Sequence, residues 1–242
     1  MKHAAFLNTE WRKLIMANYI VDGKILEPFL PAETEIDAWH HDVYVSLVGM
    51  MFCNTRVLNV PLPFHTTFPE VSLRFYVRRL HNGYYRKGIV FIKEIVPKPA
   101  IAAMANLLYK EHYVSLPMNN VNRQIDHHLH IGYEWKYRNH WNKMEVRAGT
   151  ESSPWRDGTE EEFINDRMWG YTAESALLTR EYYVEHPRWN MYPVMEHTID
   201  CDFQQLYGPA FASLNTQQPV SIYLCEGSAT TVFTNHQLWS NH

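Results

Sequence analysis

The 242-residue sequence has few cysteines, no long apolar run and no block of one charge, and each absence excludes a class of protein. Cys53, Cys201 and Cys225 lie far apart and form no Cys-x-x-Cys motif, so we expect neither a disulfide framework nor a thiolate zinc site. No uncharged stretch approaches the roughly 18 residues of a membrane-spanning helix. The net charge is -4 without a basic block, so we predict no nucleic-acid partner.

Internal repeats, low-complexity tracts and an N-terminal apolar stretch long enough for a secretory signal are also absent. These absences predict one domain over residues 1–242 in a soluble, cytoplasmic protein with no membrane partner. Hydrophobic residues make up 46% of the chain, which is enough for a sizeable core. The aromatic share of 14% suits that core or an aromatic-lined pocket equally well.

Strand patterns dominate what the sequence does contain. Apolar and polar side chains alternate over residues 71–78, so Arg74 and Tyr76 share one face of a strand. A turn at Asn82-Gly83 and an apolar run over 88–96 predict a hairpin whose second strand is covered on both faces. Further strands are expected at 39–52, 128–137, 181–184 and 220–233 (with a turn at 226–228), and short helices at 100–109, after Thr159 and at 202–214. The fold class is therefore α+β, mainly β.

Several short segments, taken in order, match a known pattern. They are Glu10-Trp11-Arg12, Asn18-Tyr19, Pro31-Ala32-Glu33-Thr34-Glu35, 44–49, 73–79, 90–97, Trp169-Gly170-Tyr171 and His186-Pro187-Arg188-Trp189. With these segments the chain resembles the YqjF-like conserved proteins (DUF2071), a bacterial family of unknown function. The resemblance covers residues 6 to 190, which is most of the chain.

That family is distantly similar to acetoacetate decarboxylase. The similarity implies an acetoacetate-decarboxylase-like β-barrel or double-layered antiparallel sheet around a pocket, with a few short helices outside. The decarboxylase uses a Schiff-base lysine activated by apolar surroundings and a second, adjacent lysine. This chain has no Lys-Lys pair and no Gly-x-Pro-Lys segment; after the short helix it reads Leu108-Tyr109-Lys110-Glu111-His112-Tyr113. Lys110 is no clear replacement, and the likeness of fold does not carry the reaction.

Lys93 and Glu94 are candidate catalytic residues on the predicted strand 88–96. On a regular strand Lys93 shares a face with Phe91, where burial would make its amine able to form an imine. The alternative is a lysine near a strand end that reaches solvent. Glu94 then points to the opposite face, and the two could line one wall only across a bulge.

Arg74 is the preferred substrate-binding residue, as a guanidinium that clamps a substrate carboxylate while Glu70 orients it. Tyr76 shares the strand face of Arg74 and is a further binding candidate. A structural ion pair between Glu70 and Arg74 explains both residues equally well, because buried charges need partners whatever their purpose.

The segment after the short helix supplies another group of candidates. Glu111 is a candidate catalytic acid or base, and Tyr109, His112 and Tyr113 are candidate substrate-binding residues. Helix capping and solvation at the surface are the alternative roles for these four side chains.

Aromatic residues in the later half form a second group. Trp169 and Tyr171 are candidate substrate-binding residues, with Tyr182, His186 and Trp189 nearby in the sequence. They could line a ligand cavity or cover the core.

On a strand, the side chains of Asp126, His128 and His130 would project from one face. Two imidazoles and a carboxylate in this arrangement could hold zinc or iron. The chain has 14 histidines, so chance clusters are common and a surface strand is the alternative. We predict no metal and no other cofactor.

Together these patterns favour a protein that binds or transforms a small organic acid or carbonyl compound in a barrel cavity near Glu70, Arg74 and Lys93. The alternative is a noncatalytic barrel that senses or sequesters an apolar metabolite. In both cases the partner is a small molecule, and the sequence is compatible with a homo-oligomer.

Overall fold

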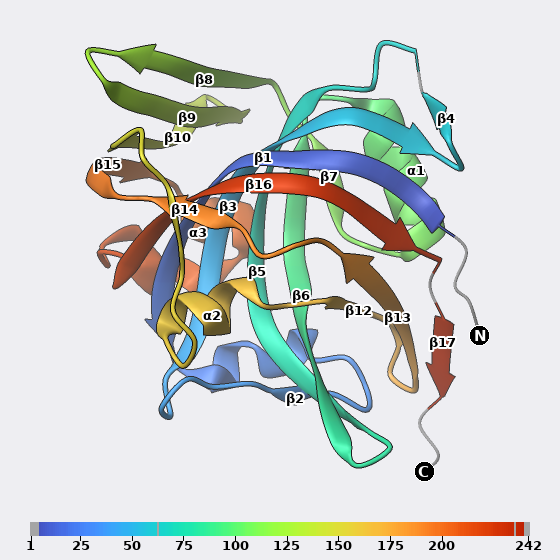
Figure 1. The fold of residues 1–242 in the computed structure, drawn as a ribbon. Helices are drawn as coiled ribbons and strands as arrows, with labels where there is room; N and C mark the ends of the chain where they lie inside the picture. Colours follow the sequence, from blue (N-terminus) through green and yellow to red (C-terminus); the bar gives the residue numbers. More distant parts are fainter. Residues whose placement is uncertain (1–4, 62, 235, 240–242) are drawn as a thin grey trace.

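The computed structural model describes residues 5–61, 63–234 and 236–239, most of which lie in two β-sheets (Figure 1). The larger sheet contains β1 (Ala5–Val21), β2 (Glu35–Ile36), β3 (Val43–Val57), β4 (Val60–Pro61), β5 (Phe68–His81), β6 (Tyr84–Val96), β7 (Tyr113–Ser115), β11 (Ser153–Pro154), β12 (Trp169–Ser175), β13 (Leu178–Glu185), β14 (Asn190–Tyr192), β16 (Ser221–Phe233) and β17 (His236–Trp239). The smaller sheet contains β8 (Met118–Ile125), β9 (His128–Tyr137), β10 (His140–Ala148) and β15 (Val194–Asp200).

The helical segments are short. They are η1 (Gly23–Ile25), η2 (Glu27–Phe29), α1 (Pro99–Tyr109), α2 (Glu160–Asn165), α3 (Phe203–Tyr207) and η3 (Pro209–Asn215). Within the described ranges, no helix combines the length and the apolar character that crossing a membrane requires.

The larger sheet curls around an interior space. Its neighbours run β11-β14-β16-β1-β3-β5-β6-β12-β13-β17, with β12 parallel to β6 and with antiparallel pairs from β16 to β6. Near the ends of this order β13 also pairs with β16, through Val184↔Val232 and Glu185↔Thr231. Figure 1 shows the first and a late strand, blue β1 and red β16, side by side. The inner face of the sheet is therefore shielded by its own curvature.

Alternation along β5 produces two packing layers. Val71 and Phe75 are fully buried on one face, in a cluster that includes Tyr133 and Trp135 of the smaller sheet. Tyr76 is on the opposite, inner face, in a second cluster with β3, α1 and α2. Each fully buried apolar side chain contributes about 1.5–3 kcal/mol. The smaller sheet thus stabilises the outer face, and the inner face is free to line a cavity.

Several local predictions are confirmed. β5 and β6 form the expected hairpin, and both turn residues, Asn82 (φ 49°) and Gly83 (φ 85°), have the positive φ of a type I′ turn. The strand over 128–137 has the predicted bounds. The helix over 202–214 is divided at Gly208-Pro209 into α3 and η3, because proline lacks the amide that would continue it.

The turn predicted at 226–228 is wrong. β16 continues through Gly227, which has a φ of 81°. A Cβ built there would lie 1.9 Å from the carbonyl oxygen of Trp11 on β1. Glycine at this position therefore marks a close approach of two paired strands, not a reversal of the chain.

Candidate functional site

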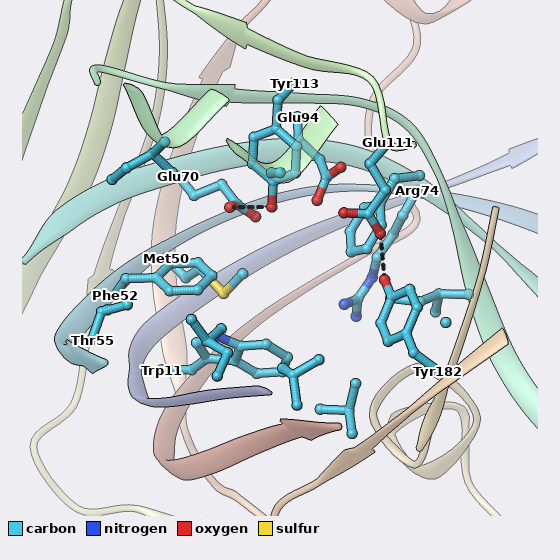
Figure 2. Close-up of a pocket in the computed structure, with 18 of the residues that line it drawn as sticks. Trp11, Met50, Phe52, Thr55, Glu70, Arg74, Glu94, Glu111, Tyr113 and Tyr182 are labelled. Carbon is cyan, nitrogen blue, oxygen red and sulfur yellow. Dashed lines mark hydrogen bonds between the residues drawn. The ribbon is translucent and has the colours of Figure 1, made fainter. Parts of the chain in front are cut away.

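A cavity of about 120 Å³ lies on the inner face of the curled sheet. Its walls come from β1, β3, β5, β6, β12, β13 and β16, from α1 and from the segment that leads into β7 (Figure 2). An engineered protein cavity of about 150 Å³ holds benzene. The space here is therefore of the right order for a small organic molecule.

Five polar side chains converge at one end of this cavity. Three are carboxylic acids, Glu70 on β5, Glu94 on β6 and Glu111 just before β7. Tyr113 Oη donates a hydrogen bond to Glu70 Oε2 (3.0 Å), and Tyr182 Oη donates one to Glu111 Oε1 (2.5 Å). In Figure 2 the carboxyl groups of Glu94 and Glu111 point toward one another. Glu94 is 1% exposed, and its Oε2 has no hydrogen-bond partner among the described residues.

The return of the chain after α1 brings Glu111 and Tyr113 to Glu94. The helix ends at Lys110, which adopts the left-handed conformation (φ 59°), and β7 then pairs in parallel with β6 so that Tyr113 lies opposite Glu94. The Asn106 side chain fixes this return: its Nδ2 donates to the Tyr113 carbonyl (2.9 Å) and its Oδ1 accepts from the Tyr113 amide (2.7 Å). Asn106 is thus a positioning residue that the sequence patterns did not indicate.

Tyr182 reaches Glu111 because its neighbour in the sheet is a glycine. Gly170 on β12 pairs directly with Tyr182 on β13. A Cβ at Gly170 would lie 2.1 Å from the Tyr182 ring. Any other residue at position 170 would push the phenol away from its present place.

Burial in apolar surroundings raises the pKa of all three carboxyls, because the ionised form loses its hydration. The pKa of Glu70 is raised to about 8, with the Glu111 charge adding to the effect of burial and Tyr113 and Arg74 opposing it. The pKa of Glu111 is raised to about 7 by burial, against the hydrogen bonds from Tyr182 and Glu94. The pKa of Glu94 is raised well above its ordinary value by burial and by its two acidic neighbours. Much of the cluster is therefore protonated at neutral pH.

Arg74 also lines the cavity, as predicted from its strand face, and is 7% exposed. Its Nη2 contacts Met16 Sδ (3.7 Å), and its Nε is buried without a hydrogen-bond partner among the described residues. No ion pair joins Arg74 to Glu70 among the described residues, and the Glu70 carboxyl accepts a hydrogen bond from Tyr113 instead. The structural ion pair considered for these two residues does not form, and the guanidinium keeps capacity for a ligand.

Lys93 does not line the cavity, and its expected alignment with Phe91 is wrong. The β5–β6 register passes from Leu73↔Lys93 to Arg74↔Phe91, so β6 carries one extra residue, Ile92. This β-bulge turns Lys93 to the outer face and Glu94 to the inner face with Phe91. Lys93 Nζ donates a hydrogen bond to the Leu206 carbonyl at the end of α3 and lies 5.6 Å from the centre of the Tyr207 ring.

Of the other predicted binding residues, some line the cavity and others do not. Trp169 lines the cavity, but Tyr76 and Tyr171 lie within the two core clusters. Tyr76 hydrogen-bonds Ser46 Oγ through its hydroxyl (2.5 Å). His112 is exposed, and only its carbonyl takes part, by accepting a hydrogen bond from the Glu94 amide (3.2 Å). The side chain of Tyr109 lies outside the part of the chain that the structure describes.

The metal alternative gains no support from the geometry. Asp126 lies in the turn before β9, while His128 and His130 lie on that strand. Among the residues described, no group of three or more His, Cys, Asp or Glu side chains could hold a metal ion.

Sequence reasoning missed most of the apolar lining. Trp11, Phe52 and Phe68 form a wall of the cavity, together with Trp189 of the later aromatic group. Trp11 and Trp189 lie in the segments that resemble the family, and for Trp11 this is the only signal in the sequence. Nothing in the sequence around Phe52 and Phe68 distinguishes a residue of a cavity wall from a residue of the hydrophobic core.

Comparison with known proteins identifies the family. The sequence profile of DUF2071, an uncharacterized conserved protein family, matches residues 8–229. The chain belongs to this family. Over 68 residues the chain is 32% identical to the uncharacterized protein YqjF of Bacillus subtilis, and this match spans 28% of each protein. The YqjF resemblance stated from the motifs is thereby confirmed.

Solved structures with the same fold are acetoacetate decarboxylase-like. An acetoacetate decarboxylase-like enzyme from Sphingomonas wittichii matches with a TM-score of 0.69 at 10% identity, over 98% of this chain and 95% of that one. The acetoacetate decarboxylase of Legionella pneumophila matches at 0.63 and 12% identity, over 98% and 88%. The enduracididine biosynthesis enzyme MppR, complexed with pyruvate, matches at 0.63 and 11% identity, over 98% and 91%. These values confirm the predicted fold, and at such identities they show the fold alone.

Proposed function

We propose that this DUF2071 protein binds a small organic acid or carbonyl compound in the cavity and moves a proton at the carbon next to the carbonyl group. The observation that carries the proposal is the convergence of Glu70, Glu94 and Glu111 in the cavity, where burial raises the pKa of all three, that of Glu111 to about 7 and that of Glu70 to about 8. General acids and bases work best when their pKa lies near the working pH. Two carboxyls that face each other with different pKa values can divide the two roles.

The roles follow from those pKa values. Glu111, with a pKa of about 7, is ionised in about half of the molecules at neutral pH and removes the proton from carbon. Glu94, whose pKa burial and its two acidic neighbours raise well above the ordinary value, stays protonated and donates its proton to the carbonyl oxygen. The product is an enol, and return of both protons restores the carbonyl compound. Arg74 binds a carboxylate of the ligand through its unpaired Nε.

An imine mechanism has no residue to carry it in this cavity. No lysine is among the described residues that line it. Lys93 lies behind the sheet, and its amine is engaged by the carbonyl of Leu206. Proton transfer by carboxyls is therefore better supported than Schiff-base chemistry.

Deuterium exchange of pyruvate tests the proposal, since the MppR neighbour is seen with pyruvate. We expect the protein to speed the exchange of the pyruvate methyl protons for deuterium in D₂O, followed by NMR. Glu111→Gln should slow the exchange about 100-fold or more, because it removes the base. Lys93→Met is the matched control and should keep the rate within about twofold. Covalent capture of pyruvate at a lysine by borohydride, or loss of exchange in the control, would contradict the proposal.

Reversible binding without turnover is the second candidate, favoured by the largely apolar and aromatic lining of the cavity. The same experiment separates the two functions. Saturable binding of pyruvate with no exchange above the buffer rate would support the noncatalytic protein.

A further inference from the structure

The cavity has two chemically different ends. Figure 2 shows the carboxyl groups of Glu70, Glu94 and Glu111 together on one side. Trp11 lies on the opposite side in this view, and Phe52, which packs against it, lies between Trp11 and Glu70. A ligand that fills this space must therefore be polar at one end and apolar at the other.

The apolar end is built from contacting aromatic rings. Phe52 and Phe68 stack with ring centroids 5.0 Å apart and an interplanar angle of 9°. Trp11 meets Phe52 edge-on at 6.0 Å and Trp189 edge-on at 6.2 Å. Trp189 is anchored by a hydrogen bond from its Nε1 to Ser228 Oγ (2.9 Å). These contacts hold the rings in one arrangement, so the wall is a preformed surface.

The same wall has an unused polar atom. Trp11 Nε1 is buried and has no hydrogen-bond partner in the part of the chain that the structure describes. Buried tryptophan N–H groups usually find an acceptor. Trp11 thus offers a ligand both a ring face and a donor.

A ligand as short as pyruvate would use only the polar end. With its acid group at the carboxyl cluster and Arg74, pyruvate has only one methyl group to offer the rings of Trp11 and Phe52. Each methylene group that a longer ligand buries strengthens binding about fourfold, and a buried ring contributes about 10- to 100-fold. The preformed wall therefore selects for a tail.

We propose that the ligand carries an aromatic or branched apolar tail that packs on Trp11, Phe52 and Trp189, with its acid or carbonyl head at the carboxyl cluster. This inference rests on the proposed function, since it assumes that the head binds as described there. It adds the class of substrate: a compound larger than pyruvate, with a tail of about the size of a phenyl ring.

Calorimetry with pyruvate and phenylpyruvate tests this inference, because the two acids share one head and differ only in the tail. We expect phenylpyruvate to bind about 10- to 100-fold more tightly. Trp11→Ala should remove most of that difference and leave pyruvate affinity within about twofold. Trp11→Phe, which keeps a ring, should retain most of it, and Trp141→Ala, at an exposed tryptophan on β10, is the matched control and should change nothing.

The possible failures can be told apart. Equal affinity of the wild-type protein for the two acids would overturn the tail and leave the proposed function standing, and this comparison needs no variant. Binding of neither acid would overturn both proposals. Loss of pyruvate affinity together with phenylpyruvate affinity in a folded Trp11→Ala protein would also overturn the tail, because Trp11 would then act on the head.

Discussion

The buried carboxyl of Glu181 and the three carboxyls of the cavity have opposite surroundings. Glu181 on β13 is 2% exposed and lies between two guanidinium groups, Arg79 Nη1 at 3.3 Å and Arg86 Nη1 at 2.5 Å. Its chain neighbour Tyr182 faces the cavity, where Glu111 and Glu70 accept hydrogen bonds from Tyr182 and Tyr113. Within the described residues none of the three cavity carboxyls forms an ion pair, and Glu94 Oε2 has no hydrogen-bond partner. A buried carboxylate with all its partners supplied holds the fold together. One without them must keep a proton or receive a ligand.

The largest effect is expected when Glu181, the carboxyl that is paired with two guanidinium groups, is replaced. Glu181→Leu leaves Arg79 and Arg86 without their counter-ion, and we expect a loss of about 3 kcal/mol in the free energy of unfolding, measured with urea. The control is Glu35→Gln, which removes an exposed ion pair with Arg78 and should cost at most about 1 kcal/mol. A loss at Glu181 no larger than the loss at Glu35 would show that the two guanidinium groups do not depend on it.

A change of opposite sign is expected in the cavity. The pKa of Glu94 in the folded protein is raised above its ordinary value of about 4.5, so above that pH folding is coupled to the uptake of a proton. The contribution of protonated Glu94 to stability is therefore complete at low pH and is lost as the pH rises toward the pKa of the folded state. Glu94→Gln removes this dependence and should stabilise the protein by more than about 1 kcal/mol at pH 8, while abolishing proton transfer. Thermal unfolding at pH 6 and pH 8 measures it, with the exposed Glu151→Gln as control. Destabilisation by Glu94→Gln at pH 8 would refute the comparison.

The smallest effect concerns the residue beside Glu94 on the same strand. Lys93→Met removes one hydrogen bond to the end of α3, and we expect a loss of about 1 kcal/mol in stability. Its affinity for a ligand of the cavity should be unchanged, because the β-bulge turns Lys93 to the outer face. Weaker binding by at least about tenfold would place Lys93 in the site after all.

Alternation and the family resemblance together pointed to part of the polar end of the cavity. The pattern over 71–78 assigned Arg74 to the correct face, and the family resemblance drew attention to the segment with Glu111 and Tyr113. The alternation pattern could not reveal Ile92 as an extra residue, because a β-bulge depends on the pairing with the neighbouring strand and cannot be recognised from the sequence of one strand. The placement of Lys93 failed for this reason.

Contacts between distant parts of the chain were the second limit. Tyr182 meets Glu111 only because β12 joins β6 in parallel and Gly170 leaves room for the phenol. Strand β8 is exposed along most of its length, so it lacks the alternation that marks a strand. Strand β10 does alternate, with Met144 and Val146 buried, and this signal could have found it.

The state of the carboxyl cluster is the central claim, and its titration tests it most directly. Infrared difference spectra of the protein between about pH 5 and pH 9, with Glu70→Gln, Glu94→Gln and Glu111→Gln for assignment, report which carboxyls carry a proton. The account predicts protonated carboxyl bands that persist at pH 7, with Glu111 titrating near 7 and Glu70 near 8. Complete ionisation of all three carboxyls by about pH 6 would contradict it.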